Sequence, residues 1–317
     1  MNPLSDGVAG FLNALLPPPI AKKSAIDLDS LAEKGRELLW MDEQVEWAKK
    51  EAEGTSFHPS QLANPCMRFD VLRHLSRVDG SGIEIMPTTE SFNYKLQRKF
   101  DVGHALHDME QQKYFRLLKD KVIGRWRCSC CGTTIEKPQL TPKPCVNSIR
   151  VYGDPSGSSA DRVKVCRNDG RWIYVEPRVV NEIWDIEGRT DLALFVPEYV
   201  GGNGIVLVDI KTVGEERWPS ITEPVEKDVR QLQIYLWFWP AEAGILRYMA
   251  QGRADEPAKH WEVRREPKVE AWVKNYIETV KKLAQEGRWQ VASPACTKRT
   301  QSRAQRCPAK KTCFPED

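Results

Sequence analysis

The stretch EGRTDLALFVPEYVGGNGIVLVDIKT, residues 187–212, constrains the fold of this chain more than any other segment. Its two apolar runs, 188–196 and 205–211, flank a glycine-containing segment, a pattern typical of two buried strands joined by a turn. Three charged residues nevertheless interrupt the apolar runs: Asp191, Asp209 and Lys211. Charges at such positions require a physical reason.

These charges are expected to converge in space. Side chains alternate along a strand, so Asp209 and Lys211 project from the same face. A turn centred near Val200 would place Asp191 opposite Asp209. Burying unpaired carboxylates costs several kcal/mol each, so the two aspartates need a cation. That cation is either Lys211, in a simple buried ion pair, or a metal ion.

The remaining periodicities predict a mixed α/β core. A helix capped by Ser60 is interrupted at Pro65, just before Cys66. Apolar residues at helical spacing predict further helices at 96–119, 225–239 and 267–287, and one or two within 26–54. Strands are expected at 171–184, 188–196, 205–211, 244–249 and in the segment HWEVRRE. Helices and strands in this order indicate a central sheet flanked by helices.

Bulk composition indicates a soluble protein and argues against a membrane span. Of the 317 residues, 41% are hydrophobic and 29% are charged, and the net charge is only +3. No apolar run approaches the roughly 18 to 20 residues that cross a bilayer. The apolar segment 8–16 has no basic leader and runs into three prolines, unlike a secretory signal. We therefore expect a cytoplasmic protein, and the proline-rich leader suits a bacterial or phage origin.

Four short motifs together resemble the RecB-like branch of the PD-(D/E)XK nuclease superfamily. They are GHALH at 103–107, GRTD at 188–191, DIK at 209–211 and QLQIY at 231–235. Any one of them arises easily by chance, whereas four in this order form a specific pattern. The resemblance covers about residues 56–124 and 175–317. It implies a restriction-endonuclease-like core, a mixed central sheet flanked by helices.

The resemblance also implies a metal site. Its ligands would be His107, Asp191, Asp209 and the backbone carbonyl of Ile210. Hard oxygen ligands suit Mg²⁺ or Mn²⁺, and one imidazole favours tolerance of Mn²⁺. A further acidic ligand is expected, for which Glu110, Glu176 and Glu182 all remain open. His104 is close to His107 in sequence and competes with it for the same assignment.

Three other residues would complete the catalytic set by resemblance. Lys211 would orient or help deprotonate the attacking water. Gln231 and Tyr235 lie one helical turn apart and would steady Lys211 or contact the nucleic-acid backbone. Two of them have an ordinary structural alternative: Tyr235 as a core aromatic residue, and Gln231 as a solvated residue near a helix start.

The nine cysteines fall into two groups that suggest metal centres, because thiols of a cytosolic protein stay reduced. The segment SQLANPCMRFDVLRHL resembles the region before the core in iron-sulfur members of the RecB-like branch, such as AddB and the CRISPR-adaptation exonucleases. By that resemblance a [4Fe-4S] cluster would be held by Cys66, Cys296, Cys307 and Cys313. The gap between Cys296 and Cys307 is longer than in that family, so zinc or free thiols remain alternatives.

The second cysteine group lies mid-chain. Cys128-x2-Cys131-Gly132 matches a zinc knuckle, in which glycine lets backbone amides point at a thiolate. Cys145 and Cys166 are the other local thiols and would complete a four-cysteine zinc site, with Cys130 as an alternative to Cys131. Free loop thiols are the competing interpretation. Such an insertion could guide DNA or bind a protein partner.

The sequence thus predicts a metal-dependent DNA nuclease, an exonuclease on single-stranded or frayed ends. A nucleic-acid-binding scaffold that keeps the fold without cutting and an endonuclease are the alternatives. The predicted organisation is an N-terminal extension (1–55), a helical part (56–124), a Cys-rich insertion (125–170), a nuclease core (171–292) and a C-terminal Cys-rich and basic segment (293–317).

Overall fold

The computed structural model describes residues 56–315, apart from 79, 84, 86–93, 119, 144, 146–147, 152–161, 167–171, 201, 240 and 254–255. The predicted N-terminal extension, with its helices at 26–54, lies outside these residues. Within the described part no helix combines the length and apolar character needed to cross a bilayer.

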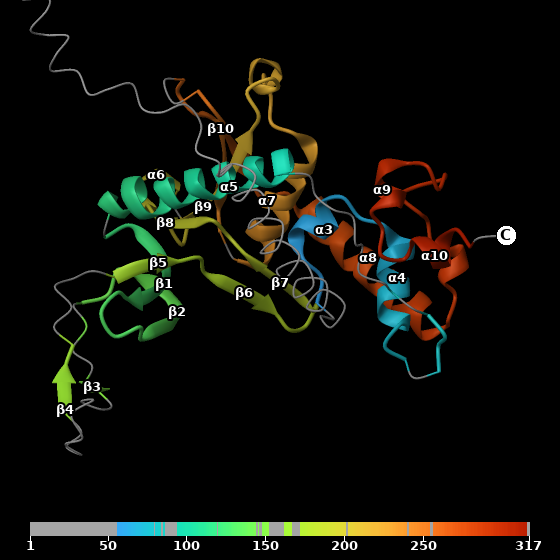
Figure 1. The fold of residues 1–317 in the computed structure, drawn as a ribbon, viewed down its shortest axis with the longest axis horizontal. Coiled ribbons are helices and arrows are strands. Elements are labelled where there is room, and N and C mark those ends of the chain that lie inside the picture. Colours follow the sequence, from blue (N-terminus) through green and yellow to red (C-terminus); the bar gives the residue numbers. More distant parts are fainter. Residues whose placement is uncertain are drawn as a thin grey trace, which may run out of the picture. The chain divides into compact units, whose positions relative to one another are not determined.

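A seven-stranded mixed sheet forms the centre of the fold (Figure 1). Its strands run in the order β11-β10-β9-β8-β1-β2, and β5 also pairs with β1. Strands β9 and β10 are parallel, and the other pairs are antiparallel. The bounds are β1 Val122–Cys128, β2 Thr134–Leu140, β5 Trp172–Val175, β8 Leu192–Phe195, β9 Ile205–Val213, β10 Ala243–Ala250 and β11 Lys259–Arg264.

Two hairpins stand apart from this sheet. One pairs β3 (Ser148–Val151) with β4 (Arg162–Val165), and the other pairs β6 (Arg178–Asn181) with β7 (Ile186–Arg189). The strand predicted over 171–184 is therefore two strands, β5 and β6. The strand predicted over 188–196 is likewise interrupted at Thr190 and Asp191, because β7 pairs with β6 whereas β8 joins the central sheet.

The helices match the predicted positions closely. Pro65 does separate two helices, α3 and α4, as expected. The longest helices pack around the sheet, and shorter ones occupy the C-terminal segment. Their bounds are α3 Pro59–Ala63, α4 Met67–Leu75, α5 Tyr94–Met109, α6 Pro197–Val200, α7 Glu226–Phe238, α8 Pro267–Gln285, α9 Ser302–Gln305 and α10 Lys310–Cys313, with 3₁₀ turns η3 Trp218–Ser220 and η4 Trp289–Val291.

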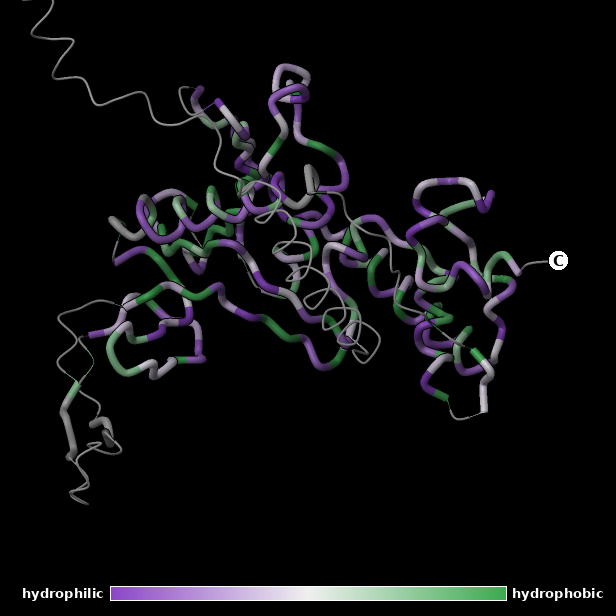
Figure 2. The backbone as a smooth tube through the Cα atoms, in the orientation of Figure 1, coloured by the Kyte–Doolittle hydropathy of each residue, from purple (hydrophilic) through white to green (hydrophobic). Residues whose placement is uncertain are grey.

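The helix predicted over 96–119 changes its winding part-way. After α5 the chain forms a π-helical turn, η1 (Glu110–Tyr114), and then a 3₁₀ turn, η2 (Phe115–Leu118). Hydrophilic and hydrophobic residues alternate along α5 (Figure 2). Gly103 and Glu110 are buried along this segment, whereas Phe100 is 46% exposed. Wide π turns commonly occur at functional sites.

Two hydrophobic cores cover opposite faces of the sheet. Leu207 of β9 belongs to the first core, with α4, α7 and α8, whereas its neighbour Val208 belongs to the second. The second core also contains Leu106 of α5 and the cysteines at 128, 145 and 166. Alternation along β9 explains the division. The expected fold class, a mixed sheet flanked by helices, is confirmed.

Part of the stretch expected as an insertion contributes to this sheet. Strand β1 pairs with β2, β5 and β8, so residues 125–128 and 134–140 belong to the central sheet. The β3–β4 hairpin, by contrast, pairs only within itself among the described residues.

Candidate active site

The register of β8 and β9 places the two aspartates as the sequence predicts. Leu192 pairs with Val208, and Phe195 pairs with Ile205. Extending this register by one residue sets Asp191 opposite Asp209. Both lie near the start of β8, where the chain arrives from β7.

Helix α5 brings His107 to the same place through a close approach at Gly103. A Cβ atom at Gly103 would lie 2.9 Å from Thr212 Oγ1 of β9, so only glycine lets the helix pack this near the strand. One turn later, His107 is half-buried and lies beside Asp191. His104, on the same helix, is exposed. Of the two histidines, His107 is the one that lies beside Asp191.

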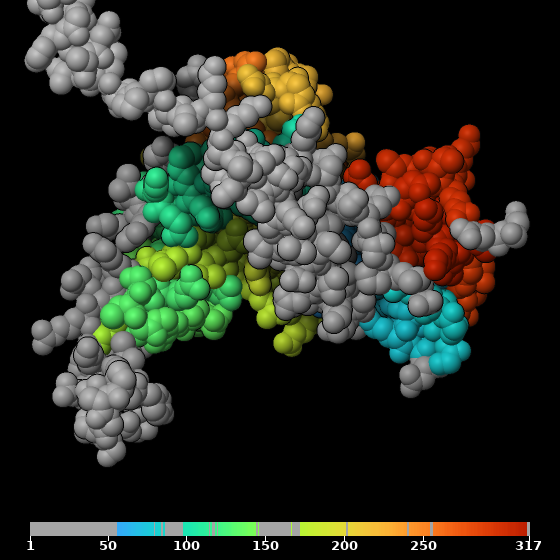
Figure 3. All heavy atoms as spheres, viewed as in Figure 1, coloured from blue at the N-terminus to red at the C-terminus, as the bar shows by residue number. Residues whose placement is uncertain are grey.

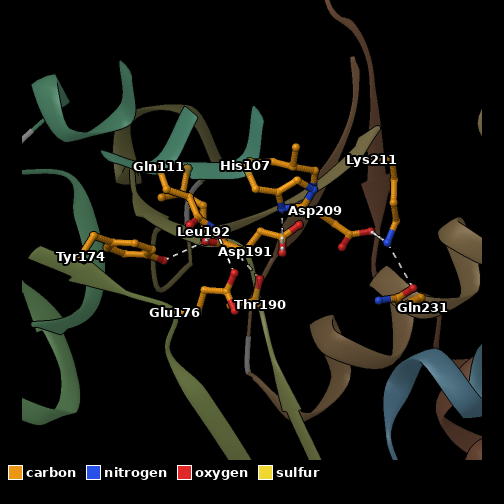
Figure 4. A network of polar contacts seen from close by, with 11 residues as sticks. His107, Gln111, Tyr174, Glu176, Thr190, Asp191, Leu192, Asp209, Lys211 and Gln231 are labelled. Atoms are coloured by element: carbon orange, nitrogen blue, oxygen red, sulfur yellow. Dashed lines mark hydrogen bonds and ion pairs between the residues drawn. The ribbon is translucent and has the colours of Figure 1, made fainter. Parts of the chain in front are cut away.

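Three side chains form a potential metal centre (Figure 4). Ligand atoms of His107, Glu176 and Asp191 lie within 4.8 Å of one another. His107 Nδ1 is 3.7 Å from Asp191 Oδ1, and the other oxygen, Oδ2, accepts a 2.6 Å hydrogen bond from the Ile210 amide. One imidazole and two carboxylates suit a divalent cation of the Mg²⁺ or Mn²⁺ type.

Two uncharged side chains hold the Glu176 carboxylate and the backbone at Asp191. Gln111, in the π turn, donates from Nε2 to Glu176 Oε1 at 3.0 Å and to the Asp191 carbonyl at 2.9 Å. Tyr174 Oη donates to the same carbonyl at 3.0 Å. The π turn places Gln111 four residues after His107, and Gln111 is buried. Such outer partners determine where ligating groups point.

Asp209 faces Lys211 and lies outside the three-residue group. Its Oδ2 is 2.8 Å from Lys211 Nζ, which also donates to Gln231 Oε1 of α7 at 3.2 Å. Both strand residues point towards the α7 side, as their alternation predicts. The predicted contact between Gln231 and Lys211 is present.

A second glycine, Gly188, leaves space for the Tyr235 ring beside the site. A Cβ at Gly188 would lie 2.8 Å from Tyr235 Cε1 and 3.0 Å from its hydroxyl oxygen. Burial raises the pKa of this hydroxyl, and the nearby Arg189 backbone opposes the shift. Tyr235 is buried, so it holds β7 against α7 beside the charged residues.

Burial and mutual repulsion dominate the electrostatics. Burial, reinforced by Asp209 and Glu176, raises the pKa of Asp191 well above its ordinary value. Burial also raises the pKa of Asp209, although Lys211 opposes the shift. Burial disfavours the charge on Lys211, but Asp209, Asp191 and Asp228 outweigh it and raise the Lys211 pKa. Excess negative charge of this kind favours a bound cation.

The geometry distinguishes among the three candidate acids. Glu176 lies in the potential metal centre. Glu110 is buried in a two-pronged ion pair with Arg247, at 3.1 and 3.2 Å. Glu182 is exposed in the turn between β6 and β7. Only the first has the position that a metal ligand requires.

The mid-chain cysteines also converge. Sulfur atoms of Cys128, Cys131, Cys145 and Cys166 lie within 4.8 Å of one another, and Cys130 is exposed outside this group. The four thiols assigned to zinc from the sequence are therefore the four that the fold brings together.

Helix α4 lies beside the C-terminal segment (Figure 3), and these two stretches carry Cys66, Cys296, Cys307 and Cys313. The Ala295 amide donates to Cys66 Sγ at 3.3 Å. Burial, reinforced by Cys307, Cys66 and Cys296, raises the pKa of Cys313 to about 12. Two ties hold the region: Arg68 donates to the Ala292 and Gln290 carbonyls, and Arg303 donates twice to Asn64. These four thiols are absent from the described groups with ligand atoms within 4.8 Å.

Comparison with known proteins yields distant structural likenesses. No protein-family model and no curated protein matches the chain. An alkaline exonuclease from Laribacter hongkongensis, LHK-Exo in complex with dAMP, is 9% identical with a TM-score of 0.41, over 75% of this chain and 91% of that one. The protein SSO0001 is 18% identical with a TM-score of 0.34, over 74% and 83% of the two chains. A phage related exonuclease from Haemophilus somnus 129PT is 14% identical with a TM-score of 0.24, over 34% and 58%.

Two side chains of the site, Glu176 and Gln111, were not singled out by the sequence. Glu176 was one of three equivalent candidates, and Gln111 carried no signal because its role depends on the π turn after α5.

Proposed function

We propose that the protein is a metal-dependent DNA nuclease of the PD-(D/E)XK, RecB-like type that hydrolyses phosphodiester bonds. The observation that carries the proposal is the convergence of His107, Glu176 and Asp191 beside the Asp209-Lys211 pair. These residues come from distant parts of the chain. A simple buried aspartate-lysine bridge leaves the imidazole and the other two carboxylates unexplained.

The donor set fits a hard divalent cation. We assign His107, Glu176 and Asp191 as side-chain ligands, with Asp209 and the Ile210 carbonyl completing the site. A bound Mg²⁺ or Mn²⁺ would neutralise charge on the scissile phosphate and make a bound water more acidic. The raised pKa of Asp191 supports this assignment, because burial and then the charges of Asp209 and Glu176 disfavour its carboxylate form, and a bound cation would offset both effects.

The protein's own residues supply positioning and charge. Lys211, held as an ammonium by Asp209, donates hydrogen bonds and is suited to orient water and stabilise negative charge on the phosphate. Gln231 fixes the direction of that ammonium. Tyr235 supports the strand that leads into Asp191. Gln111 holds the Glu176 carboxylate, and Gln111 and Tyr174 both donate to the backbone carbonyl of Asp191.

The cysteines around α4 fit an iron-sulfur cluster in their chemistry. Cys66, Cys296, Cys307 and Cys313 come from both ends of the described chain and influence one another electrostatically. A cluster of four irons is wider than a single ion, so its thiolates stand farther apart than those of a zinc site. We assign a [4Fe-4S] cluster to these four residues. The nucleases that the cysteine pattern resembles are exonucleases on single-stranded or frayed DNA ends, and we propose the same activity for this protein.

The test is degradation of end-labelled single-stranded DNA with Mn²⁺. We expect Lys211→Ala to reduce the rate about 10²- to 10⁴-fold, because it removes the charge that orients water and phosphate. His107→Ala should abolish activity at low Mn²⁺ and recover in part at high Mn²⁺. His104→Ala is the matched control, since this histidine is exposed on the same helix, and should cleave like the wild type.

Three outcomes would each contradict one part of the proposal. Equal, metal-independent rates for wild type and Lys211→Ala would favour a binding protein that keeps the fold without cutting. Cleavage of covalently closed circular single strands as fast as linear ones would identify an endonuclease instead of an exonuclease. Brown, anaerobically purified protein with broad visible absorbance is expected for the cluster, and a colourless preparation with zinc alone would disprove it.

A further inference from the structure

The four mid-chain thiols have the spacing of a mononuclear tetrahedral site. Cys128 Sγ lies 3.5 Å from Cys166 Sγ, and Cys131 Sγ lies 3.7 Å from Cys145 Sγ. Zinc binds thiolates at about 2.3 Å, so tetrahedral ligation separates neighbouring sulfurs by about 3.8 Å. The observed separations match that value.

The backbone around Cys128 is shaped to hold a thiolate. The amides of Cys130 and Cys131 both point at Cys128 Sγ, each at 3.4 Å. Gly132 then takes a positive φ of 72°, and its amide closes the turn by donating to the Cys128 carbonyl at 3.0 Å. Two amide donors stabilise negative charge on sulfur, as a metal-binding thiolate requires. Neutral thiols in a loop would not require two amide donors on one sulfur.

The site joins three separate pieces of chain. Cys128 ends β1 and Cys131 lies in the turn towards β2, whereas Cys145 precedes the β3–β4 hairpin and Cys166 follows it. The next strand after Cys166 is β5, whose Trp172 pairs with Cys128 in register. Trp172 Nε1 also donates to the Lys143 carbonyl at 2.9 Å. The four thiols therefore anchor the start of β5.

Strand β5 leads directly into the candidate active site. Tyr174 donates to the Asp191 carbonyl, and Glu176 follows one residue after the strand. Gln112 of the π turn holds the strand from the other side, donating to the Tyr174 carbonyl at 2.9 Å and accepting from its amide at 3.3 Å. One continuous core connects the sulfurs with Tyr174 and Ile210.

We propose that Cys128, Cys131, Cys145 and Cys166 bind one zinc ion, which fixes β5 and thereby positions Glu176 and Asp191. Four soft thiolates in tetrahedral spacing suit zinc. The site is a structural one because all four positions are taken by protein sulfurs. The second half of the proposal rests on the proposed nuclease function, whereas zinc binding does not.

The first experiment measures zinc in the full-length protein purified without added metal. Wild type and Cys130→Ser should each hold one zinc per chain, because Cys130 is exposed and outside the group. Cys145→Ser should lose it, and Cys66→Ser should keep it. Iron in place of zinc at this site, or undiminished zinc in Cys145→Ser, would overturn the proposal.

The second experiment measures Mn²⁺ binding calorimetrically, without DNA. Tyr174→Phe leaves all four thiols in place and removes only the hydroxyl that donates to Asp191, so this variant remains informative if Cys145→Ser does not fold. We expect Tyr174→Phe to retain zinc and to bind Mn²⁺ about tenfold more weakly. Affinity within twofold of the wild type would refute the positioning role.

Together the two experiments distinguish failure of the zinc site from failure of the proposed nuclease function. Zinc in the wild type together with no measurable Mn²⁺ binding would leave the zinc site standing, and would overturn both the positioning role and the proposed function. Absence of zinc with intact Mn²⁺ binding would overturn the zinc site alone.

Discussion

At the scale of single residues, an uncharged side-chain amide determines where the acidic residues of the site lie. Gln111 is buried and donates from one nitrogen to Glu176 and to the Asp191 carbonyl. Without this donor the Glu176 carboxylate and the backbone at Asp191 would lose their common partner. The distance between the two acidic residues therefore depends on one side chain that is neither charged nor a metal ligand.

We therefore expect Gln111→Met, which keeps the side-chain volume, to weaken Mn²⁺ binding about 10- to 100-fold. The measurement is calorimetric titration of the purified protein. Lys113→Met, an exposed position in the same π turn, is the control and should bind Mn²⁺ like the wild type. Equal affinities for the two variants would show that the amide does not orient the carboxylates.

His74 of α4 makes a pH-dependent contribution to stability. Burial, together with the positive charges of Arg73 and Arg77, lowers its pKa from 6.5 to about 4. Below about pH 6.5 the unfolded chain binds a proton that the folded chain excludes until about pH 4. The stability supplied by the neutral ring is thus present above this window and is lost as the pH falls through it.

His74→Leu should remove this dependence. Between about pH 7 and pH 5 we expect the free energy of unfolding to fall by about 2 kcal/mol more in the wild type than in the variant. Urea denaturation at several pH values measures the difference. Parallel pH profiles for the two proteins would contradict the assignment to His74.

At the scale of elements, two glycines determine how closely helices approach the strands of the site. The roles of Gly103 and Gly188 in their motifs are steric: each leaves space that a Cβ would occupy. At Gly188 the obstacles are the Tyr235 ring and Pro59 Cδ, at 2.8 and 3.0 Å, and both are firmly packed. An added methyl group there has to displace β7 from α7 and α3.

Gly188→Ala should consequently cost about 1 to 3 kcal/mol of stability, as overpacking does in well-filled interiors. It should also lower nuclease activity by shifting Asp191, three residues along the chain. Gly214→Ala is the control, because the nearest atoms to its new methyl group belong to the carboxylate of Glu216, which can move. Thermal unfolding of both variants tests the difference, and similar melting temperatures would contradict a steric role for Gly188.

The sequence predicted some of these elements well because their signals are local. The opposition of Asp191 and Asp209 follows from the turn position and alternation alone, and the register of β8 and β9 agrees with it. Strand β1 was hidden because arginines and a cysteine obscure its alternation, although Val122, Trp126 and Cys128 are buried in turn. The choice of Glu176 depends on contacts between β5 and the π turn, which no local pattern encodes.

At the scale of the whole described chain, its two ends are held together around α4. Arg68 and Asn64 lie near the start, and their partners, the Ala292 carbonyl and Arg303, lie more than two hundred residues later. Helix α8 packs on α4, and Tyr276 donates to the buried Asp70 at 2.6 Å. In the sequence, only the resemblance of the cysteine positions to those of iron-sulfur nucleases predicted this association. Hydrogen bonds between remote segments produce no periodic pattern in the sequence.

A cluster bridging Cys66 to Cys296, Cys307 and Cys313 would make that association covalent in effect. Cross-linking so long a loop restricts the unfolded chain by roughly 5 kcal/mol in the chain-entropy model. We expect oxidative removal of the cluster, or Cys66→Ser, to lower the free energy of unfolding by several kcal/mol and to expose the C-terminal segment to proteases first. Cys130→Ser, an exposed thiol outside both cysteine groups, should leave stability and the cleavage pattern unchanged. Arg68 and Arg303 still hold the two ends together without the cluster. Loss of the cluster should therefore lower nuclease activity only slightly, although it lowers the free energy of unfolding by several kcal/mol. Equal stability with and without the cluster would mean that hydrogen bonds and packing alone hold the two ends together.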